Sequence, residues 1–259
     1  MADLSLDSYW RLPPLSRTVA TAAFIISISV HLGLLPGSWF IFYPRLVFSF
    51  TPQLWRFVTA FLITGPSLGL LFDTYFVYSY LSQLEVGNPR FPRKEDLIWY
   101  LMFVGGTIMT INYLVGFGFV AFLQALILAM CYTVTQDQRG AKVNYMFITI
   151  PAQLAPFAML LFNLLFPGGV SNMMLQIQGL VAAHLYDFLT RIWPEYGGGS
   201  NLIPTPHVVT RLVQAVGRVV GTAVARTSGQ TPSTGSSTGV SRGPLPESWR
   251  SRGPGHRLG

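Results

Sequence analysis

Long apolar segments separated by short polar connections make up the first three quarters of the chain. A helix needs roughly 17–25 mostly apolar residues to cross the hydrocarbon layer of a membrane. Six segments meet or approach this length, and we expect helices at about 16–35, 57–82, 97–115, 119–134, 145–166 and 173–192. The pattern predicts an all-α membrane protein in which a six-span domain, residues 16–192, follows a short polar segment, residues 1–15.

The loop between the first two segments, residues 36–56, is unusually rich in aromatic side chains and ends in Trp55-Arg56. Its three prolines prevent it from forming one straight helix. Trp and Tyr favour the headgroup level of a membrane, where the ring is buried and its polar edge stays hydrated. We therefore expect the loop to lie in the membrane surface. In a soluble protein the same loop would cover a core, so the choice depends on the class of protein.

The composition favours a membrane protein over a soluble one. Hydrophobic residues account for 51% of the chain and charged residues for 10%, whereas soluble domains carry roughly 25% charged residues. The hydropathy excludes a soluble nucleic-acid binder despite the net charge of +7. The single cysteine, Cys131, excludes an intramolecular disulfide.

The positions of the basic residues predict the orientation. With the N-terminus in the cytosol, the loops on the far side contain only Arg45 and Arg56, and the other fifteen of the seventeen Lys and Arg residues face the cytosol. Membrane proteins show this asymmetry because basic residues are retained on the cytosolic side. An even number of spans then places the C-terminus in the cytosol as well.

A connector and a basic amphipathic helix are expected over residues 193–226. Between Pro206 and Arg226, apolar residues recur at helical spacing while Arg211 and Arg218 fall on the opposite face, a pattern typical of a helix on anionic lipid or on the protein's own surface. Residues 227–259 are mostly Ser, Thr, Gly, Pro and Arg. This composition predicts a disordered tail.

Several predicted spans contain strongly polar residues, which in lipid normally face protein or water. The candidates are Asp73, Asn112, Gln124, Gln176, Gln178, His184 and Asp187. One interpretation is a polar groove open to one side of the membrane, for which we select Asp73, Asn112, Gln124 and Gln178. The alternative is hydrogen bonding between helices, with Asp187 near the membrane surface. Asp73 is the strongest candidate, because an unpaired carboxylate near mid-span is hardest to accommodate.

The sixth segment also carries a packing signal and a histidine. Gly179 and Ala183 form a small-xxx-small pair that permits close helix approach, and His184 follows directly. A membrane serine protease would need a serine facing a histidine, but residues 119–134 contain none. A Cys131–His184 pair is compatible in depth, although a buried thiol and a satisfied histidine are the more ordinary interpretation.

Other activities receive less support from the residues. No spacing typical of metal ligands, phosphate loops or nucleotide binding is present, so we expect no cofactor and no metal. A polar-solute carrier would require broken helices at matching positions of two repeats. Gly65-Pro66 supplies one break, and the second half offers no counterpart.

Four short motifs give the chain, from about Trp10 to Arg211, a resemblance to the Derlin family, rhomboid-like pseudoproteases of the endoplasmic reticulum membrane. These motifs are Trp55-Arg56, Leu84-Glu85-Val86-Gly87, Ala183-His184-Leu185-Tyr186 and Pro204-Thr205-Pro206. Derlins usually have glycine where this chain has Ala183. The resemblance implies a rhomboid-like bundle without catalytic activity.

The resemblance resumes at Gly253, Gly255, Arg257, Leu258 and Gly259, which are similar to the SHP box. Arg252 stands where an aromatic residue normally precedes the first glycine. This motif implies binding to an AAA ATPase of the valosin-containing protein class.

The family further implies partnership with a membrane ubiquitin ligase complex and retrotranslocation of misfolded luminal or membrane proteins. A closed homo-oligomer would enclose a channel, whereas a single copy would offer half of one.

Overall fold

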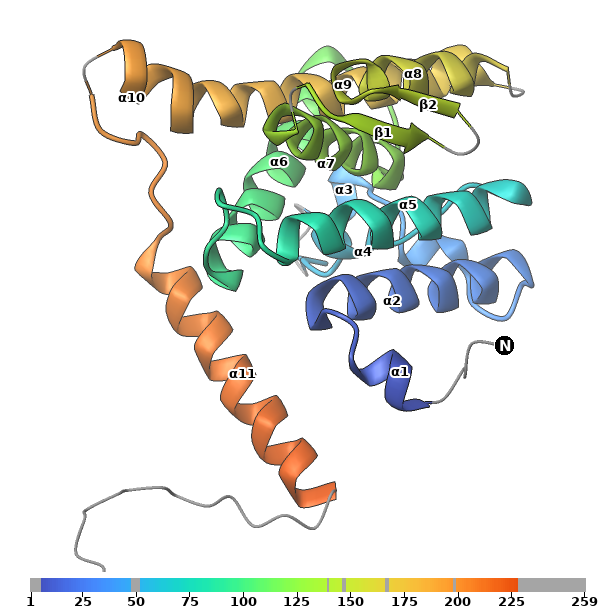
Figure 1. The fold of residues 1–259 in the computed structure, drawn as a ribbon. Coiled ribbons are helices and arrows are strands. Elements are labelled where there is room, and N and C mark those ends of the chain that lie inside the picture. Colours follow the sequence, from blue (N-terminus) through green and yellow to red (C-terminus); the bar gives the residue numbers. More distant parts are fainter. Residues whose placement is uncertain are drawn as a thin grey trace, which may run out of the picture. The chain divides into compact units, whose positions relative to one another are not determined.

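The computed structural model describes residues 6–47, 52–138, 140–145, 148–165, 168–197 and 199–227. Contacts divide the chain into two compact units, one ending at Leu212 and the other beginning at Val213. The first unit is a bundle of helices with one small β-hairpin (Figure 1). The predicted helical fold is therefore confirmed in its coarse form.

Six longer helices build the bundle. They are α2 (Pro14–His31), α5 (Leu68–Glu85), α6 (Lys94–Val115), α7 (Leu123–Asp137), α8 (Ala155–Leu164) and α9 (Gly169–Asp187). Shorter helices are α1 (Leu6–Trp10), α3 (Pro44–Val47), α4 (Arg56–Thr59) and α10 (Trp193–Tyr196), and α11 (His207–Thr227) follows the bundle in sequence. A π-helical turn, Phe188–Ile192, joins α9 to α10.

The longer helices alternate in direction along the chain. The end of α5 contacts the beginning of α2 through Glu85, so these two helices are antiparallel. Helices α7 and α9 are parallel, because the Gly179 backbone lies against Ala125 and, further along both helices, Tyr132 bonds to His184. Helix α5 is parallel to α7, because Asp73 and Gln124 near their beginnings share one cavity wall and Asn88, just after α5, donates to Asp137 at the end of α7. Helices α5, α7 and α9 therefore begin at one end of the bundle and finish at the other.

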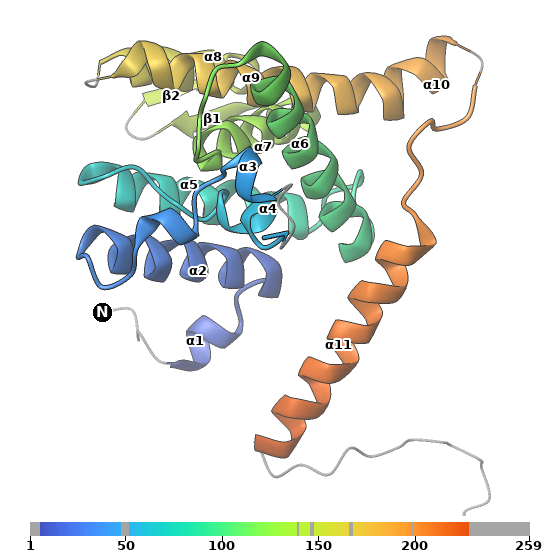
Figure 2. The same ribbon diagram turned by 180° about the vertical axis from the view of Figure 1, so that it is seen from behind.

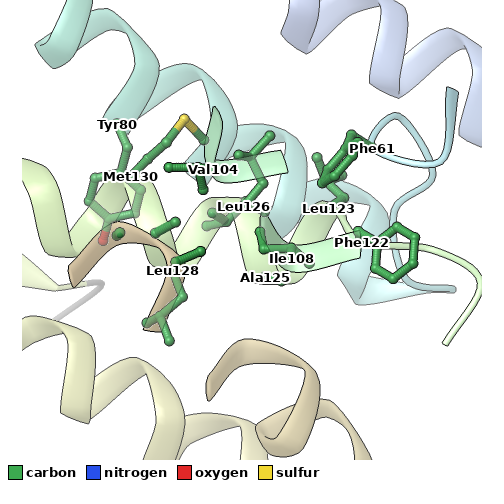
Figure 3. Packing of buried hydrophobic residues seen from close by; sticks show 14 of the residues in the cluster. Phe61, Tyr80, Val104, Ile108, Phe122, Leu123, Ala125, Leu126, Leu128 and Met130 are labelled. Atoms are coloured by element: carbon green, nitrogen blue, oxygen red, sulfur yellow. The ribbon is translucent and has the colours of Figure 1, made fainter. Parts of the chain in front are cut away.

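Helix α7 occupies the centre of the core. Buried side chains surround it on nearly all sides, as expected for a helix that is hydrophobic all round. Figure 3 shows Leu123, Leu126 and Met130 of this helix among side chains from α5 and α6, such as Tyr80 and Ile108. The position of α7 makes it the element against which α5, α8 and α9 all pack.

Two predicted segments differ from the observed elements. The segment expected over 57–82 begins with α4, breaks between Ala60 and Ser67, and resumes as α5. Pro66 lies within that break and cannot continue a helix interior. In place of a helix starting near residue 145, antiparallel strands β1 (Lys142–Tyr145) and β2 (Ile148–Pro151) precede a 3₁₀ turn and α8. Figure 2 shows α3 and α4 on the side of the bundle away from this hairpin.

Helix lengths vary widely. Among the described helices, α6 alone has both the length and the apolar composition needed to cross a membrane. Helix α8 belongs to a short apolar segment and contains 10 residues, which corresponds to about 15 Å at 1.5 Å per residue. The bundle therefore combines one full-length apolar helix with neighbours that are shorter or more polar.

Candidate functional site

The loop before α5 is held together by a buried arginine. Arg56 has 3% of its surface exposed. Its Nη1 atom donates to the carbonyls of Ser38 and Ile41 at 2.6 Å, and its Nε atom donates to Gln53 Oε1 at 2.6 Å. A guanidinium supplies several donors in a fixed planar arrangement. Arg56 thus closes the loop from inside, while Trp55 is 54% exposed.

The same loop is joined to the link between α6 and α7. The Phe42 N–H donates to the Val120 carbonyl at 2.8 Å, and the Phe122 N–H donates to the Ala60 carbonyl at 2.9 Å. The ring of Phe122 lies 5.7 Å from that of Phe42 and 5.6 Å from that of Phe61. The loop therefore has a fixed inner face, and its outer face carries exposed apolar residues: Trp39, Leu54, Trp55 and Val58.

A cavity of about 410 Å³ lies where α5, α7 and α9 begin and α8 ends. Of the predicted groove residues, Asp73 and Gln124 line it together, and Gln176 joins them. The Gly65 N–H donates to Asp73 Oδ2 at 2.8 Å, and Gln124 hydrogen-bonds to the same carboxylate. This carboxylate therefore lies near the beginning of α5, in the wall of a largely apolar cavity, where Gly65 and Gln124 are its partners and no cation of the described residues pairs with it.

The non-helical segment between α4 and α5, beside this cavity, is stabilised by a serine that was not among the polar residues singled out from the sequence. Ser27 of α2 is fully buried. Its hydroxyl donates to the Leu62 carbonyl at 3.0 Å and accepts from the Thr64 N–H at 2.9 Å. The break would otherwise leave these backbone groups unpaired. The sequence gives no signal for it, since the same segment contains other hydroxyl residues such as Thr21 and Ser29.

The two other predicted groove residues lie elsewhere. Asn112 bonds to Phe119 twice, through Nδ2 to the carbonyl at 3.0 Å and through Oδ1 to the N–H at 3.1 Å. It therefore stabilises the end of α6. Gln178 is buried outside the cavity wall, and its amide atoms have no hydrogen-bond partner among the described residues.

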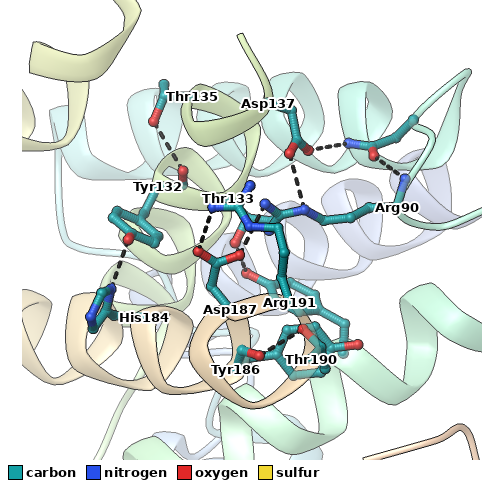
Figure 4. A network of polar contacts seen from close by, with 12 residues as sticks. Arg90, Tyr132, Thr133, Thr135, Asp137, His184, Tyr186, Asp187, Thr190 and Arg191 are labelled. Carbon is teal, nitrogen blue, oxygen red and sulfur yellow. Dashed lines mark hydrogen bonds and ion pairs between the residues drawn. The ribbon is translucent and has the colours of Figure 1, made fainter. Parts of the chain in front are cut away.

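The predicted packing residues of α9 divide between two roles. Gly179 lies directly on the backbone of α7, where a Cβ atom would overlap the Ala125 carbonyl oxygen. Ala183 is buried. His184 is exposed at the edge of the helix, and its Nδ1 atom lies 2.8 Å from the Tyr132 hydroxyl (Figure 4). Cys131 is completely buried.

The opposite end of the bundle carries a network of charges (Figure 4). Arg90 lies between two carboxylates, 3.0 Å from Asp137 and 3.0 Å from Asp187. Asp187 also pairs with Arg191 at 2.9 Å. Asn88 donates to Asp137 at 3.2 Å and accepts from the Arg90 N–H at 2.8 Å. The network joins the ends of α7 and α9 to the turn after α5.

Two of the sequence motifs have a structural explanation at this end. Glu85 accepts hydrogen bonds from the N–H groups of Leu15 and Ser16 at 2.9 and 2.8 Å. These donors lack partners within α2, and a carboxylate is favourable beside a helix N-terminus. Thr205, from the Pro-Thr-Pro motif, donates to Asp96 at 2.7 Å and fixes the connector to the beginning of α6. The SHP-like residues Gly253–Gly259 lie outside the described residues.

Comparison with known proteins gives one consistent family. A family model described as the Der1-like family matches residues 12–207. The chain is 29% identical to Derlin-1 of Arabidopsis thaliana over 80% of this chain and 76% of that protein. It is 28% identical to Derlin-1 of Homo sapiens over 82% and 83%, and 27% identical to Derlin-2.1 of Zea mays over 82% and 87%.

Proposed function

Because the chain belongs to the Der1-like family, we propose that it is a non-catalytic membrane component of endoplasmic-reticulum-associated degradation. In this role it helps misfolded luminal or membrane proteins return to the cytosol, together with a membrane ubiquitin ligase complex. The proposed location is the endoplasmic reticulum membrane, with both termini in the cytosol.

Six crossings are the topology that we propose for the bundle. The alternating directions of α2, α5, α6, α7, α8 and α9 support it. The distribution of Lys and Arg in the sequence also supports it, since the luminal loops would contain only Arg45 and Arg56. In this orientation the cavity faces the lumen and the charge network faces the cytosol.

The observation that carries the mechanism is the length of the helices. Helix α8, which carries exposed apolar side chains, has 10 residues, or about 15 Å, against about 30 Å for the hydrocarbon core. A bilayer adapts to short spans by thinning, at fractions of a kcal/mol per Å. Thinner hydrocarbon beside α8 lowers the barrier for a polar polypeptide that must cross.

The loop that contains Arg56 is the proposed luminal anchor of this thinned region. Its inner face is fixed by the guanidinium, so the exposed Trp55 is presented in a defined position. Trp at such a surface favours the headgroup layer. Of the two roles open to an arginine at this position, reaching lipid phosphate or capping backbone carbonyls, the contacts of Arg56 with Ser38 and Ile41 favour the second.

An arginine series tests the anchor. Arg56→Ala should stall removal of a misfolded luminal substrate in cells, measured as its half-life after synthesis is blocked, while the protein still inserts into the membrane. Arg56→Lys should fail as well, because an ammonium cannot reproduce the planar set of donors. Arg45→Ala, an exposed arginine of the same loop, is the matched control and should retain activity. Full activity of Arg56→Lys would show that only the charge matters and would contradict the anchor.

Proteolysis receives no support from the contacts of the candidate residues. Cys131 is completely buried, and His184 is bonded to Tyr132 instead. A nucleophile must reach its substrate and lie within hydrogen-bond distance of its base. We expect purified protein to produce no cleaved products from a co-reconstituted membrane substrate, and Cys131→Ala to leave substrate removal unchanged.

Recruitment of an AAA ATPase is the last part of the proposal, and it rests on sequence alone. The residues concerned are Gly253, Gly255, Arg257, Leu258 and Gly259. Truncation after Leu245 should abolish co-purification of an ATPase of the valosin-containing protein class and leave the membrane bundle intact. Unchanged co-purification would remove this part of the proposal without affecting the anchor.

A further inference from the structure

Helices α5 and α8 line two sides of the cavity. Helices α5 and α8 both pack against α7, and α7 forms the back wall through Gln124 and Ile127. The apolar part of the wall consists of Leu68, Phe72, Phe76, Ile127, Met159 and Phe162. Its volume of about 410 Å³ falls within the range that small ligands occupy in proteins, roughly 300–1,000 Å³.

The polar part of the wall offers acceptors. Gln124 and Gln176 each have a buried Oε1 atom without a hydrogen-bond partner among the described residues, and Gln176 is only 2% exposed. The orientations of the Gln124 and Asn163 amides are fixed by their neighbours. Gln124 bonds to the Asp73 carboxylate, and Asn163 Nδ2 donates to the Met159 carbonyl at 3.0 Å. Since these neighbours can only accept, the amide nitrogens face them and the oxygens are left for a ligand.

The charge of the wall is negative, and its unpartnered polar atoms are hydrogen-bond acceptors, so both favour a cationic donor. Asp73 is the ionisable residue of the wall, and no Lys, Arg or His is among the described residues that line it. Buried acceptors without partners are destabilising. A ligand with several N–H donors and a positive charge satisfies both these acceptors and the carboxylate. A primary ammonium has three donors and no acceptor.

We propose that this cavity binds the ammonium group of an ethanolamine phospholipid. A lipid is favoured over a water-soluble amine because both lining helices carry exposed apolar side chains beside the lining residues: Leu68 and Leu71 on α5, and Leu161 and Leu164 on α8. The acyl chains would lie along these residues while the headgroup enters the cavity. Choline lipids carry the same charge but no N–H donor, so they are poor ligands for this site. The inference does not rest on the proposed role in degradation.

The experiment measures lipid binding to the full-length protein in detergent by native mass spectrometry. Dihexanoyl phosphatidylethanolamine should bind saturably, and its N-methyl, N,N-dimethyl and N,N,N-trimethyl derivatives should bind progressively more weakly as donors are lost. We expect at least about a tenfold difference between the ends of this series. Equal affinity along the series would show that the N–H donors are not recognised, and no saturable binding would leave water as the occupant. Either result would overturn the proposal.

Variants locate the site. Asp73→Asn and Gln176→Leu should each weaken phosphatidylethanolamine binding about tenfold. Gln178→Leu is the matched control on the same helix, since it removes a buried amide outside the cavity wall. Equal loss in all three variants would contradict the assignment. Binding of a lysine-containing peptide with the same dependence on Asp73, in the absence of lipid binding, would assign the cavity to polypeptide side chains instead. The methylation series needs no variant and therefore remains decisive if one fails to fold.

Discussion

The two ends of the bundle differ in how their polar groups are paired. At the end where α5, α7 and α9 finish, the carboxylates at the helix ends have partners: Arg90 forms ion pairs with Asp137 and Asp187, and Glu85 accepts from the first N–H groups of α2. At the end where the same helices begin, Gln124 and Gln176 keep buried oxygens without partners in the described part of the chain. A network of paired charges stabilises a single arrangement, whereas unsatisfied groups are retained where a ligand supplies the missing partner.

The largest effect is expected at the end with the paired charges. Asp187→Ala removes the carboxylate that pairs with both Arg90 and Arg191 and leaves Arg90 partly buried with one partner fewer. Breaking a buried ion pair costs about 3 kcal/mol or more, which lowers the unfolding temperature on the order of 10 °C for a chain of this size. Unfolding in detergent can be followed by tryptophan fluorescence.

Arg191→Ala is the matched control for this change. It removes the other partner of Asp187, but the Arg191 side chain is 39% exposed, and exposed pairs contribute about 0–1 kcal/mol. If Arg191→Ala destabilised the protein as much as Asp187→Ala, burial would not distinguish the two pairs.

The second effect concerns the close backbone contact between α7 and α9. Gly179→Ala places a methyl group against the Ala125 carbonyl, so α9 must move away from α7. Overpacking of this kind costs about 1–3 kcal/mol, and we expect the upper part of this range because the obstacle is backbone. Gly106→Ala on α6 is the control, since a Cβ atom there meets nothing within 4 Å. That substitution should stabilise the helix by about 0.5–1 kcal/mol.

The sequence predicted the helical class and singled out Asp73 as a carboxylate within an apolar segment, Arg56 as the end of the aromatic loop, and Gly179 as part of a small-xxx-small pair. It did not predict which polar residues share the cavity. Gln176 and Gln178 are two residues apart on one helix, so they point to nearly opposite faces, and only the neighbouring helices decide which face meets the cavity. The hairpin was missed because a short apolar run suits a strand and a buried helix equally well.

A pair of amide substitutions tests the contrast between partnered and unpartnered groups directly. In detergent without ethanolamine lipid, Gln176→Leu should leave stability unchanged or raise it by about 1 kcal/mol, because a buried acceptor without a described partner is removed. Asn112→Leu should lower stability by about 1–3 kcal/mol, because the Phe119 N–H loses its acceptor. Both changes replace an amide with leucine, so thermal unfolding of the two variants under one condition gives the comparison. Shifts of the same sign would mean that amide burial, not partnering, decides stability here.

The smallest effect comes from a strained residue at the open end. Ser67 has φ +56° and ψ −117°, and the Gly69 N–H donates to the Pro66 carbonyl at 3.1 Å. These values define a type II′ turn, whose first central position favours glycine. Ser67→Gly should therefore raise stability by about 0.4–1 kcal/mol, because relief of strain outweighs the added freedom of the unfolded chain. Ser67→Ala, which keeps the Cβ atom, should gain nothing, and a gain for alanine equal to that for glycine would locate the cost in the hydroxyl group and not in the backbone. Since Ser67 lines the cavity, phosphatidylethanolamine binding to the glycine variant would also show whether this strain serves to hold the cavity open.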